Sequence, residues 1–159
     1  MKHALVAYFS ATGVTQRIAN MLALAIDAKA FEIVPREIYT KQDLDWTNDN
    51  SRSSLEMKDK TSRPKIESHV IDIKKYDVVF IGFPIWWYRE PSIIDTFMES
   101  YDFEGKTVVP FATSGSSGMG NSSEIMQKLA PKAKVVQGKR FENNVSQEEL
   151  AIWAAKWLK

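Results

Sequence analysis

The sequence Ser10-Ala11-Thr12-Gly13-Val14-Thr15 separates two segments whose hydrophobic patterns differ. Before it, residues 4–9 form a continuous apolar run that is typical of a buried strand. After it, apolar side chains recur at the spacings of three and four that mark one face of a helix, at Ile18, Met21, Leu22, Ala25 and Ile26. The six residues are therefore predicted to form a strand-to-helix turn.

A turn of this kind favours an anion, because the first helical N–H groups lack intrahelical partners and lie at the positive end of the helix dipole. Ser10, Thr12 and Thr15 add hydroxyl groups, and Gly13 permits a close backbone approach. The turn contains no lysine or arginine, unlike an ATPase P-loop, and lacks the three glycines of a dinucleotide-binding turn. It suits one phosphate monoester held by neutral donors, although the same residues could simply cap a helix.

Length and composition favour one ordinary globular domain that spans residues 1–159. The formal charge is +1, from 21 basic and 20 acidic residues, so we expect neither nucleic acid nor an anionic membrane as a partner. The absence of cysteine excludes disulfides, thiolate metal sites and cysteine nucleophiles. His3 and His69 are too isolated to indicate a metal or catalytic site. With no signal peptide or long apolar run recognisable, a cytoplasmic location is expected.

Strand and helix patterns alternate along the rest of the chain. Further strands are predicted at residues 30–35, 77–82, 106–112 and 134–137, and helices at about 92–101, 121–129 and 146–158. Asn121 with Glu124 and Ser146 with Glu149 are predicted capping boxes. Pro110 should cause a local irregularity in the fourth strand, because proline has no N–H to donate. Residues 36–75 show only a weak helical pattern within 43–60, and we expect scaffold there, or one wall of a substrate approach.

Alternation of this kind predicts a doubly wound, five-stranded parallel sheet with helices on both faces. With the strand order 2-1-3-4-5, the first, third and fourth strands are neighbours. The loops after the first, third and fourth strands would then meet at one edge of the sheet. The second of these loops holds Pro84, Ile85, Trp86, Trp87 and Tyr88, and the third holds Thr113, Ser114, Gly115, Ser116, Gly118 and Gly120. Taken alone, the aromatic residues could be core and the glycine-rich loop a surface connection.

Together, the three loops resemble the flavodoxin-like family along essentially the whole chain. Residues 10–15 are similar to that family's phosphate loop, residues 83–88 to its aromatic loop along the flavin ring, and residues 113–120 to the loop on the other side of the ring. The resemblance implies noncovalently bound flavin mononucleotide (FMN), with the cofactor-binding residues drawn from these loops and no catalytic side chain required. We expect one of Trp86 and Trp87 to pack inward and the other to face the ligand.

Three functions are compatible with the resemblance. The first is an FMN-dependent oxidoreductase that takes electrons from NAD(P)H or a reductase and passes them to a quinone-like acceptor. The second is a single-electron carrier that docks to redox proteins, and the third is an interaction module without cofactor, which the intact hydroxyls of residues 10–15 disfavour. Family electron carriers are usually strongly acidic, whereas this chain is near neutral and has Arg89 beside its aromatic loop, so the oxidoreductase is favoured. A homodimer is a further possibility, since an aromatic loop at a crevice could face a second subunit.

Overall fold

The structure is a computed structural model that describes residues 2–114 and 118–159. Its strands are β1 (Ala4–Tyr8), β2 (Lys29–Glu32), β3 (Val78–Pro84), β4 (Thr107–Thr113), β5 (Lys134–Val135) and β6 (Lys139–Phe141). Its α-helices are α1 (Val14–Ala25), α2 (Arg52–Lys58), α3 (Ser92–Ser100), α4 (Ser122–Leu129) and α5 (Gln147–Ala155), and residues Ile73–Lys75 form a 3₁₀ turn.

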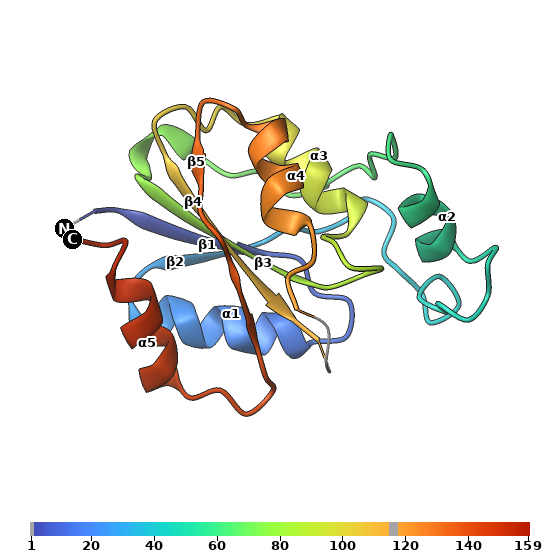
Figure 1. Cartoon of the computed structure of the whole chain (residues 1–159), viewed down its shortest axis with the longest axis horizontal. Helices are drawn as coiled ribbons and strands as arrows, with labels where there is room; N and C mark the ends of the chain where they lie inside the picture. The colour runs from blue at the N-terminus through green and yellow to red at the C-terminus, as the bar shows by residue number, and fades with distance from the viewer. Residues whose placement is uncertain (1, 115–117) are drawn as a thin grey trace.

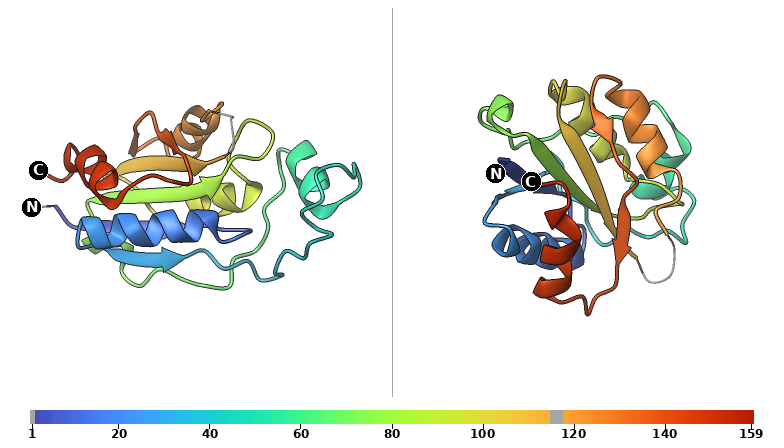
Figure 2. Two further views of the ribbon diagram at one scale, coloured as in Figure 1. Left: turned by 90° about the horizontal axis from the view of Figure 1, so that it is seen from below. Right: turned by 60° about the vertical axis from the view of Figure 1, so that its left-hand side comes forward.

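The strands form one parallel sheet of order β2-β1-β3-β4-β5, with β6 also paired to β4. Helices α1 and α5 cover one face, and α3 and α4 cover the other (Figure 1). The predicted α/β class and strand order are therefore confirmed. Helix α2 lies apart from these layers, beyond the carboxyl ends of the strands, and long connections join it to the sheet (Figure 2).

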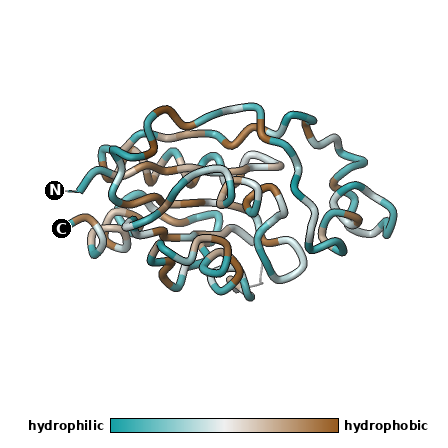
Figure 3. Tube along the Cα trace, turned by 90° about the horizontal axis from the view of Figure 1, so that it is seen from above, coloured by the Kyte–Doolittle hydropathy of each residue, from teal (hydrophilic) through white to brown (hydrophobic). Residues whose placement is uncertain are grey.

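Two apolar clusters lie on opposite faces of the sheet, because successive side chains of a strand alternate between its faces. Leu5 and Ala7 of β1 belong to the cluster that includes Ile94 and Phe97 of α3. Val6 and Tyr8, the intervening residues of β1, belong to the cluster that α1 and α5 complete. The brown, hydrophobic segments of Figure 3 accordingly concentrate in the strands and on the inner sides of the helices.

Pro110 lies within β4 without breaking it, and the irregularity occurs in the neighbouring strand. Val136 N–H donates to the Val108 carbonyl at 3.0 Å, and the next ladder bond would need an N–H on residue 110. Proline has none, and the pairing of β4 with its neighbour resumes only at Phe111 with Lys139. The predicted strand at 134–137 is therefore replaced by β5 and β6, which are separated by residues 136–138.

Several other predicted boundaries differ from the structure. The second strand ends at Glu32 instead of Pro35, and Pro35 forms an isolated antiparallel bridge with Ile66. Only Arg52–Lys58 of the weak 43–60 pattern is helical. Asn121 precedes α4 without a side-chain capping bond, whereas Ser146 Oγ accepts the N–H of Glu149 as predicted. Helix α5 ends at Ala155, before the last two apolar residues of its expected stripe.

Candidate functional site

A groove of about 1030 Å³ lies at the carboxyl ends of β1, β3 and β4. This position is where open α/β sheets commonly bind ligands. Residues from all three predicted loops line it, namely Thr12, Val14, Pro84, Ile85, Trp86, Thr113 and Ser114. The structure thus brings the three loops together, as the strand order predicted.

The 10–15 turn connects β1 to α1 through a left-handed glycine. Gly13 has φ +97°, which strongly favours glycine, and α1 begins at the next residue. Ser10 Oγ accepts the N–H of Gly13 at 3.0 Å and closes the turn from within. Thr12 and Gly13 are exposed, and the first N–H groups of α1 have no carbonyl partner within the helix. The turn therefore presents backbone donors and the Thr12 side chain at one end of the groove.

Thr15 has a different place from the other predicted donors. Its side chain is buried, and its hydroxyl shares a 2.8 Å hydrogen bond with the hydroxyl of Thr113, at the end of β4. This bond joins the first loop to the third beneath the groove. Thr15 therefore has a partner within the protein. Its structural role is to fix the distance between the 10–15 turn and the end of β4, which form two walls of the groove.

The second loop makes a tight turn with unusual backbone geometry. Trp86 and Arg89 exchange backbone hydrogen bonds of 3.0 and 3.2 Å, and the two residues between them, Trp87 and Tyr88, have φ values of +49° and +66°. Positive φ at both central positions is the pattern of a type I′ turn, in which asparagine and glycine are preferred. Bulky aromatic residues in this conformation store strain, which is commonly found at functional sites.

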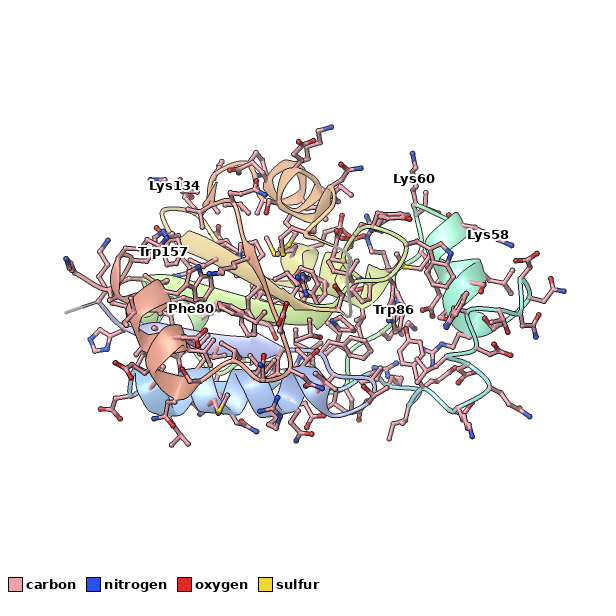
Figure 4. The ribbon with its side chains drawn as sticks, turned by 60° about the horizontal axis from the view of Figure 1, so that its bottom comes forward. Lys58, Lys60, Phe80, Trp86, Lys134 and Trp157 are labelled. Atoms are coloured by element: carbon pink, nitrogen blue, oxygen red, sulfur yellow. The ribbon has the colours of Figure 1, made fainter. Side chains whose placement is uncertain are left out.

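The two tryptophans of this turn lie in different surroundings. Trp86 is partly buried, with its ring 5.7 Å from Phe9 and 5.5 Å from Tyr39, both in edge-to-face geometry. Figure 4 shows Trp86 at the end of the sheet that faces α2. Trp87 is 44% exposed. Trp86 is thus the inward-packed residue of the pair, and it also forms part of the groove wall.

Gly120 makes the close backbone approach that the sequence suggested, but toward another loop. A Cβ on this residue would lie 1.8 Å from the carbonyl oxygen of Tyr88, and the Asn121 N–H donates to the same oxygen at 3.0 Å. Gly120 therefore packs the third loop against the aromatic turn. A Cβ on Gly118 would meet open space. Gly115 and Ser116, also predicted site residues, lie outside the described residues.

A buried charged cluster supports the aromatic turn from below. Arg89 contacts Glu90 at 3.2 Å and also pairs with Asp95 of α3, and both carboxyl groups are almost completely buried. Burial raises the pKa of Glu90 to about 9. A hydrogen bond that protonated Glu90 donates to Asp95 and the negative charge of Asp95 add to the shift, while Arg89 opposes it. Glu90 is therefore neutral at pH 7, and Arg89 is held by Asp95 directly beneath the turn.

The structure adds two groove segments that sequence reasoning missed. Residues 141–144, which follow β6, line the groove, and Arg17 of α1 holds them by donating to the carbonyl and the side chain of Asn143. The strand order itself could have identified this loop, because it follows the neighbour of β4. Trp46, which is 73% exposed, also lines the groove, and it comes from the 36–75 segment, for which we expected scaffold or one wall of a substrate approach.

The chemistry of the groove is that of a site for a phosphate-bearing aromatic ligand. Its lining combines the hydroxyl groups of Thr12, Thr113 and Ser114 with the aromatic side chains of Trp46, Trp86 and Phe141, and it includes one carboxylate, Glu142. Within the described part of the chain, no group of three or more His, Asp or Glu side chains could hold a metal ion. Among the same residues, no helix is long and apolar enough to cross a membrane.

Comparison with known proteins identifies relatives along the full chain. No curated protein matches the sequence. A candidate flavoprotein from Bacteroides eggerthii is 46% identical, with a TM-score of 0.93 over 99% of this chain and 98% of that one. Another from Bacteroides uniformis is 47% identical, with a TM-score of 0.91 over 97% and 98% of the two chains.

A more distant structure shares the fold. The flavoprotein from Lactobacillus acidophilus, solved in complex with FMN, is 21% identical and has a TM-score of 0.75 over 100% of both chains. The sequence profile described as flavodoxin matches residues 3–157 of this chain. The chain therefore belongs to the flavodoxin family.

Proposed function

We propose that this protein binds FMN in the groove and acts as an FMN-dependent oxidoreductase. The observation that carries the proposal is the convergence of the 10–15 turn, the 84–88 loop and the end of β4 on one groove of about 1030 Å³. That volume is ample for a nucleotide-sized ligand. Family membership and the FMN complex of the Lactobacillus flavoprotein support the same cofactor.

In the proposed complex, each wall of the groove has a separate task. Thr12 and the N–H groups that begin α1 would bind the phosphate, and Pro84, Ile85 and Trp86 would pack along the flavin ring and exclude water. Ser114, Gly118 and Gly120 would lie on the other side. Bound FMN would supply the electron chemistry, so the protein needs only to bind, orient and shield it.

The proposed electron donor is NAD(P)H or a reductase, and the proposed acceptor is a quinone-like compound. The near-neutral charge supports this assignment over a protein-docking carrier, which gains from a strong charge of one sign. The exposed Trp46 and Tyr88 and the half-exposed Trp87 offer a small aromatic molecule a contact surface beside the groove.

The decisive experiment is titration of the purified chain with FMN, followed by a steady-state assay. Quenching of flavin fluorescence with a one-to-one endpoint is expected, and failure to bind FMN would refute both redox functions. NADH or NADPH oxidation that depends on both the FMN-loaded protein and an added quinone supports the oxidoreductase. Bound FMN that exchanges electrons with redox proteins and gives no such turnover would instead identify a carrier.

A further inference from the structure

A second cavity, of about 370 Å³, opens beside the groove between the aromatic turn and the segment that precedes and begins α2. Leu44, Trp46 and Ser53 form one side, and Trp87 and Tyr88 form the other. Trp46, Ile85 and Trp86 line both this cavity and the larger groove. A molecule bound in the smaller cavity would therefore lie next to a ligand in the groove.

The wall that α2 provides is held in place by polar contacts. Arg52 forms a 3.0 Å ion pair with Glu56, donates to the Glu37 carbonyl at 2.7 Å, and lies 3.8 Å over the Tyr39 ring. Tyr39 donates its hydroxyl proton to Glu56 at 2.5 Å and packs against Trp86. Ser92 of α3 donates to the Glu56 carbonyl at 3.3 Å. The cavity thus has a fixed wall, although α2 itself lies apart from the sheet.

Ser53 gives this cavity a polar group with no protein partner. Ser53 is 2% exposed, and its Oγ is buried without a hydrogen-bond partner. No other side-chain hydroxyl in the described residues is both buried and without a partner. The neighbouring Ser51 and Ser54 are also buried, but they bond to each other at 2.9 Å. A buried hydroxyl without a partner is costly, and a ligand that bonds to it recovers that cost.

The lining of the cavity selects a neutral, flat occupant. Tryptophan and tyrosine rings favour stacking with another aromatic plane. None of the described residues that line the cavity is charged, so nothing there would neutralise a pyrophosphate or a carboxylate. The hydroxyl of Ser53 can donate to a carbonyl oxygen. These properties together fit a neutral aromatic dicarbonyl compound.

We propose that this cavity is the binding site of the electron acceptor, with Trp46 and the aromatic turn stacking on a quinone-type ring and Ser53 donating to one of its carbonyls. The assignment rests on the proposed oxidoreductase function, which it deepens by naming the acceptor's site. It also gives a function to the segment that precedes α2, for which the sequence predicted scaffold or one wall of a substrate approach.

The test measures two dissociation constants for each variant of the full-length protein. The first is for 2-methyl-1,4-naphthoquinone, measured by calorimetry with and without saturating FMN, and the second is for FMN alone. The absence of cysteine removes thiol adducts of the quinone as a complication. Ser53→Ala should weaken quinone binding about three- to tenfold, with FMN affinity changed less than about twofold. Trp46→Ala should weaken quinone binding by a similar factor or more, and it should weaken FMN binding by a smaller factor, because Trp46 also lines the groove.

Two control variants separate the cavity from general damage. Ser54→Ala alters a buried serine of the same helix that does not line the cavity, and Ile152→Ala truncates an exposed apolar side chain on α5. Both should leave quinone affinity unchanged, and a thermal melt of each variant identifies any loss of folding. Should Ser53→Ala melt early, binding is measured at a temperature where it is folded, and Trp46→Ala, at an exposed position, repeats the test.

The results distinguish failure of the proposed acceptor site from failure of the proposed function. If the wild-type protein does not bind the naphthoquinone, or if Ser53→Ala and Trp46→Ala both bind it normally, the cavity is not the acceptor site. Equal losses of quinone and FMN affinity would also overturn the proposal, because the cavity would then belong to the FMN site. Failure of the proposed function is seen separately, as the absence of FMN binding in the wild-type protein.

Discussion

The three hydroxyl side chains of the 10–15 turn have unequal roles in the structure. Ser10 and Thr15 bond to groups within the protein, Ser10 to the Gly13 N–H and Thr15 to Thr113. Thr12 is exposed and lines the groove. The sequence could identify all three as hydroxyl donors. It could not show which of them bond within the protein, because the partner of Thr15 lies in a strand about a hundred residues later. Thr12 is consequently the side chain at which a phosphate site is tested most directly.

Replacing Thr12 by aspartate should weaken FMN binding steeply. A carboxylate about 4 Å from the phosphate would be disfavoured by roughly 4 kcal/mol per unit-charge pair at an effective dielectric constant near 20. That energy corresponds to roughly a thousandfold loss of FMN affinity. Riboflavin has no phosphate, so its affinity should change far less. Titrating the Thr12→Asp protein with both flavins measures the difference.

The same variant distinguishes a phosphate site from a helix cap. An aspartate at the beginning of α1 stabilises the helix when no anion is bound, so the melting temperature of the cofactor-free variant should equal or exceed that of the wild type. Equal losses of FMN and riboflavin affinity would remove residues 10–15 from the phosphate site. A lower melting temperature together with such losses would indicate damage to the turn.

At the scale of elements, the turn between Trp86 and Arg89 is held in a conformation that its own sequence disfavours. Trp87→Asn with Tyr88→Gly supplies the residues that a type I′ turn prefers and keeps the backbone hydrogen bonds. Relief of strain should raise the free energy of unfolding by roughly 1–3 kcal/mol. Chemical denaturation of the cofactor-free protein measures this gain.

The stabilised turn should bind its ligands less well. Loss of the Trp87 and Tyr88 rings removes aromatic contact worth about 1 kcal/mol per ring beside the groove, so flavin or quinone affinity should fall several-fold. Higher stability with lower affinity would show that the strain is retained for binding. Unchanged affinity for both ligands would mean that the two rings contact neither, and the aromatic contacts would then come from Trp46, Trp86 and Phe141.

Gly120 and Gly118 make a matched pair for testing how the third loop is positioned. Gly120→Ala would place a Cβ 1.8 Å from the Tyr88 carbonyl oxygen at a φ of +57°, so the loop and the aromatic turn must separate. The expected cost is about 1–3 kcal/mol of stability, together with weaker FMN binding. Gly118→Ala places a Cβ in open space, so its stability should match that of the wild type, and its FMN affinity should fall less than that of Gly120→Ala. Similar behaviour of the two variants would show that this contact does not position the loop.

The broken fifth strand shows which element boundaries a sequence can predict. The sequence shows that Pro110 has no backbone N–H to donate. Which strand loses a ladder hydrogen bond depends on the neighbouring strand that the backbone of residue 110 faces within β4. The Val136 to Val108 hydrogen bond shows that this side faces β5, so the neighbouring strand is interrupted while β4 continues. The assembled sheet determines the direction in which residue 110 points and the strand that it faces. Local strand propensity does not predict either of them.

At the scale of the whole molecule, the fold was predictable because its signals are repeated and mutually consistent. Apolar strands, amphipathic helices and three small-residue or aromatic loops all indicated one sheet order, and the structure confirms that order. The wall that includes Trp46 was not predictable. Its position depends on Arg52, Glu56 and Tyr39, whose contacts join separate segments and leave no periodic pattern. The position of a segment without a periodic pattern can be explained only when the residues that it contacts are known.

The buried cluster of Arg89, Glu90 and Asp95 makes the stability of the whole molecule depend on pH. The pKa of Glu90 is raised to about 9 in the folded protein, from an ordinary value of 4.5, chiefly by burial. Between these values the unfolded chain has released the proton that the folded protein still holds. Unfolding therefore becomes easier as the pH rises, and the contribution of Glu90 is complete below about pH 4.5 and is lost by about pH 9.

The expected result is a melting temperature that falls from about pH 5.5 to about pH 8.5, by several degrees if the loss reaches 1–2 kcal/mol. Glu90→Gln keeps the shape of the side chain without a titrating proton, so its melting temperature should change less over this range and exceed that of the wild type at the alkaline end. Arg63 also lies near Asp95, and its ion-pair partner on the surface side is Glu99. Glu99→Gln, at a more exposed partner of Arg63, is the control and should keep the wild-type slope. A wild-type melting temperature that rises across the range, or equal slopes for the wild type and Glu90→Gln, would show that Glu90 is ionised beneath the aromatic turn.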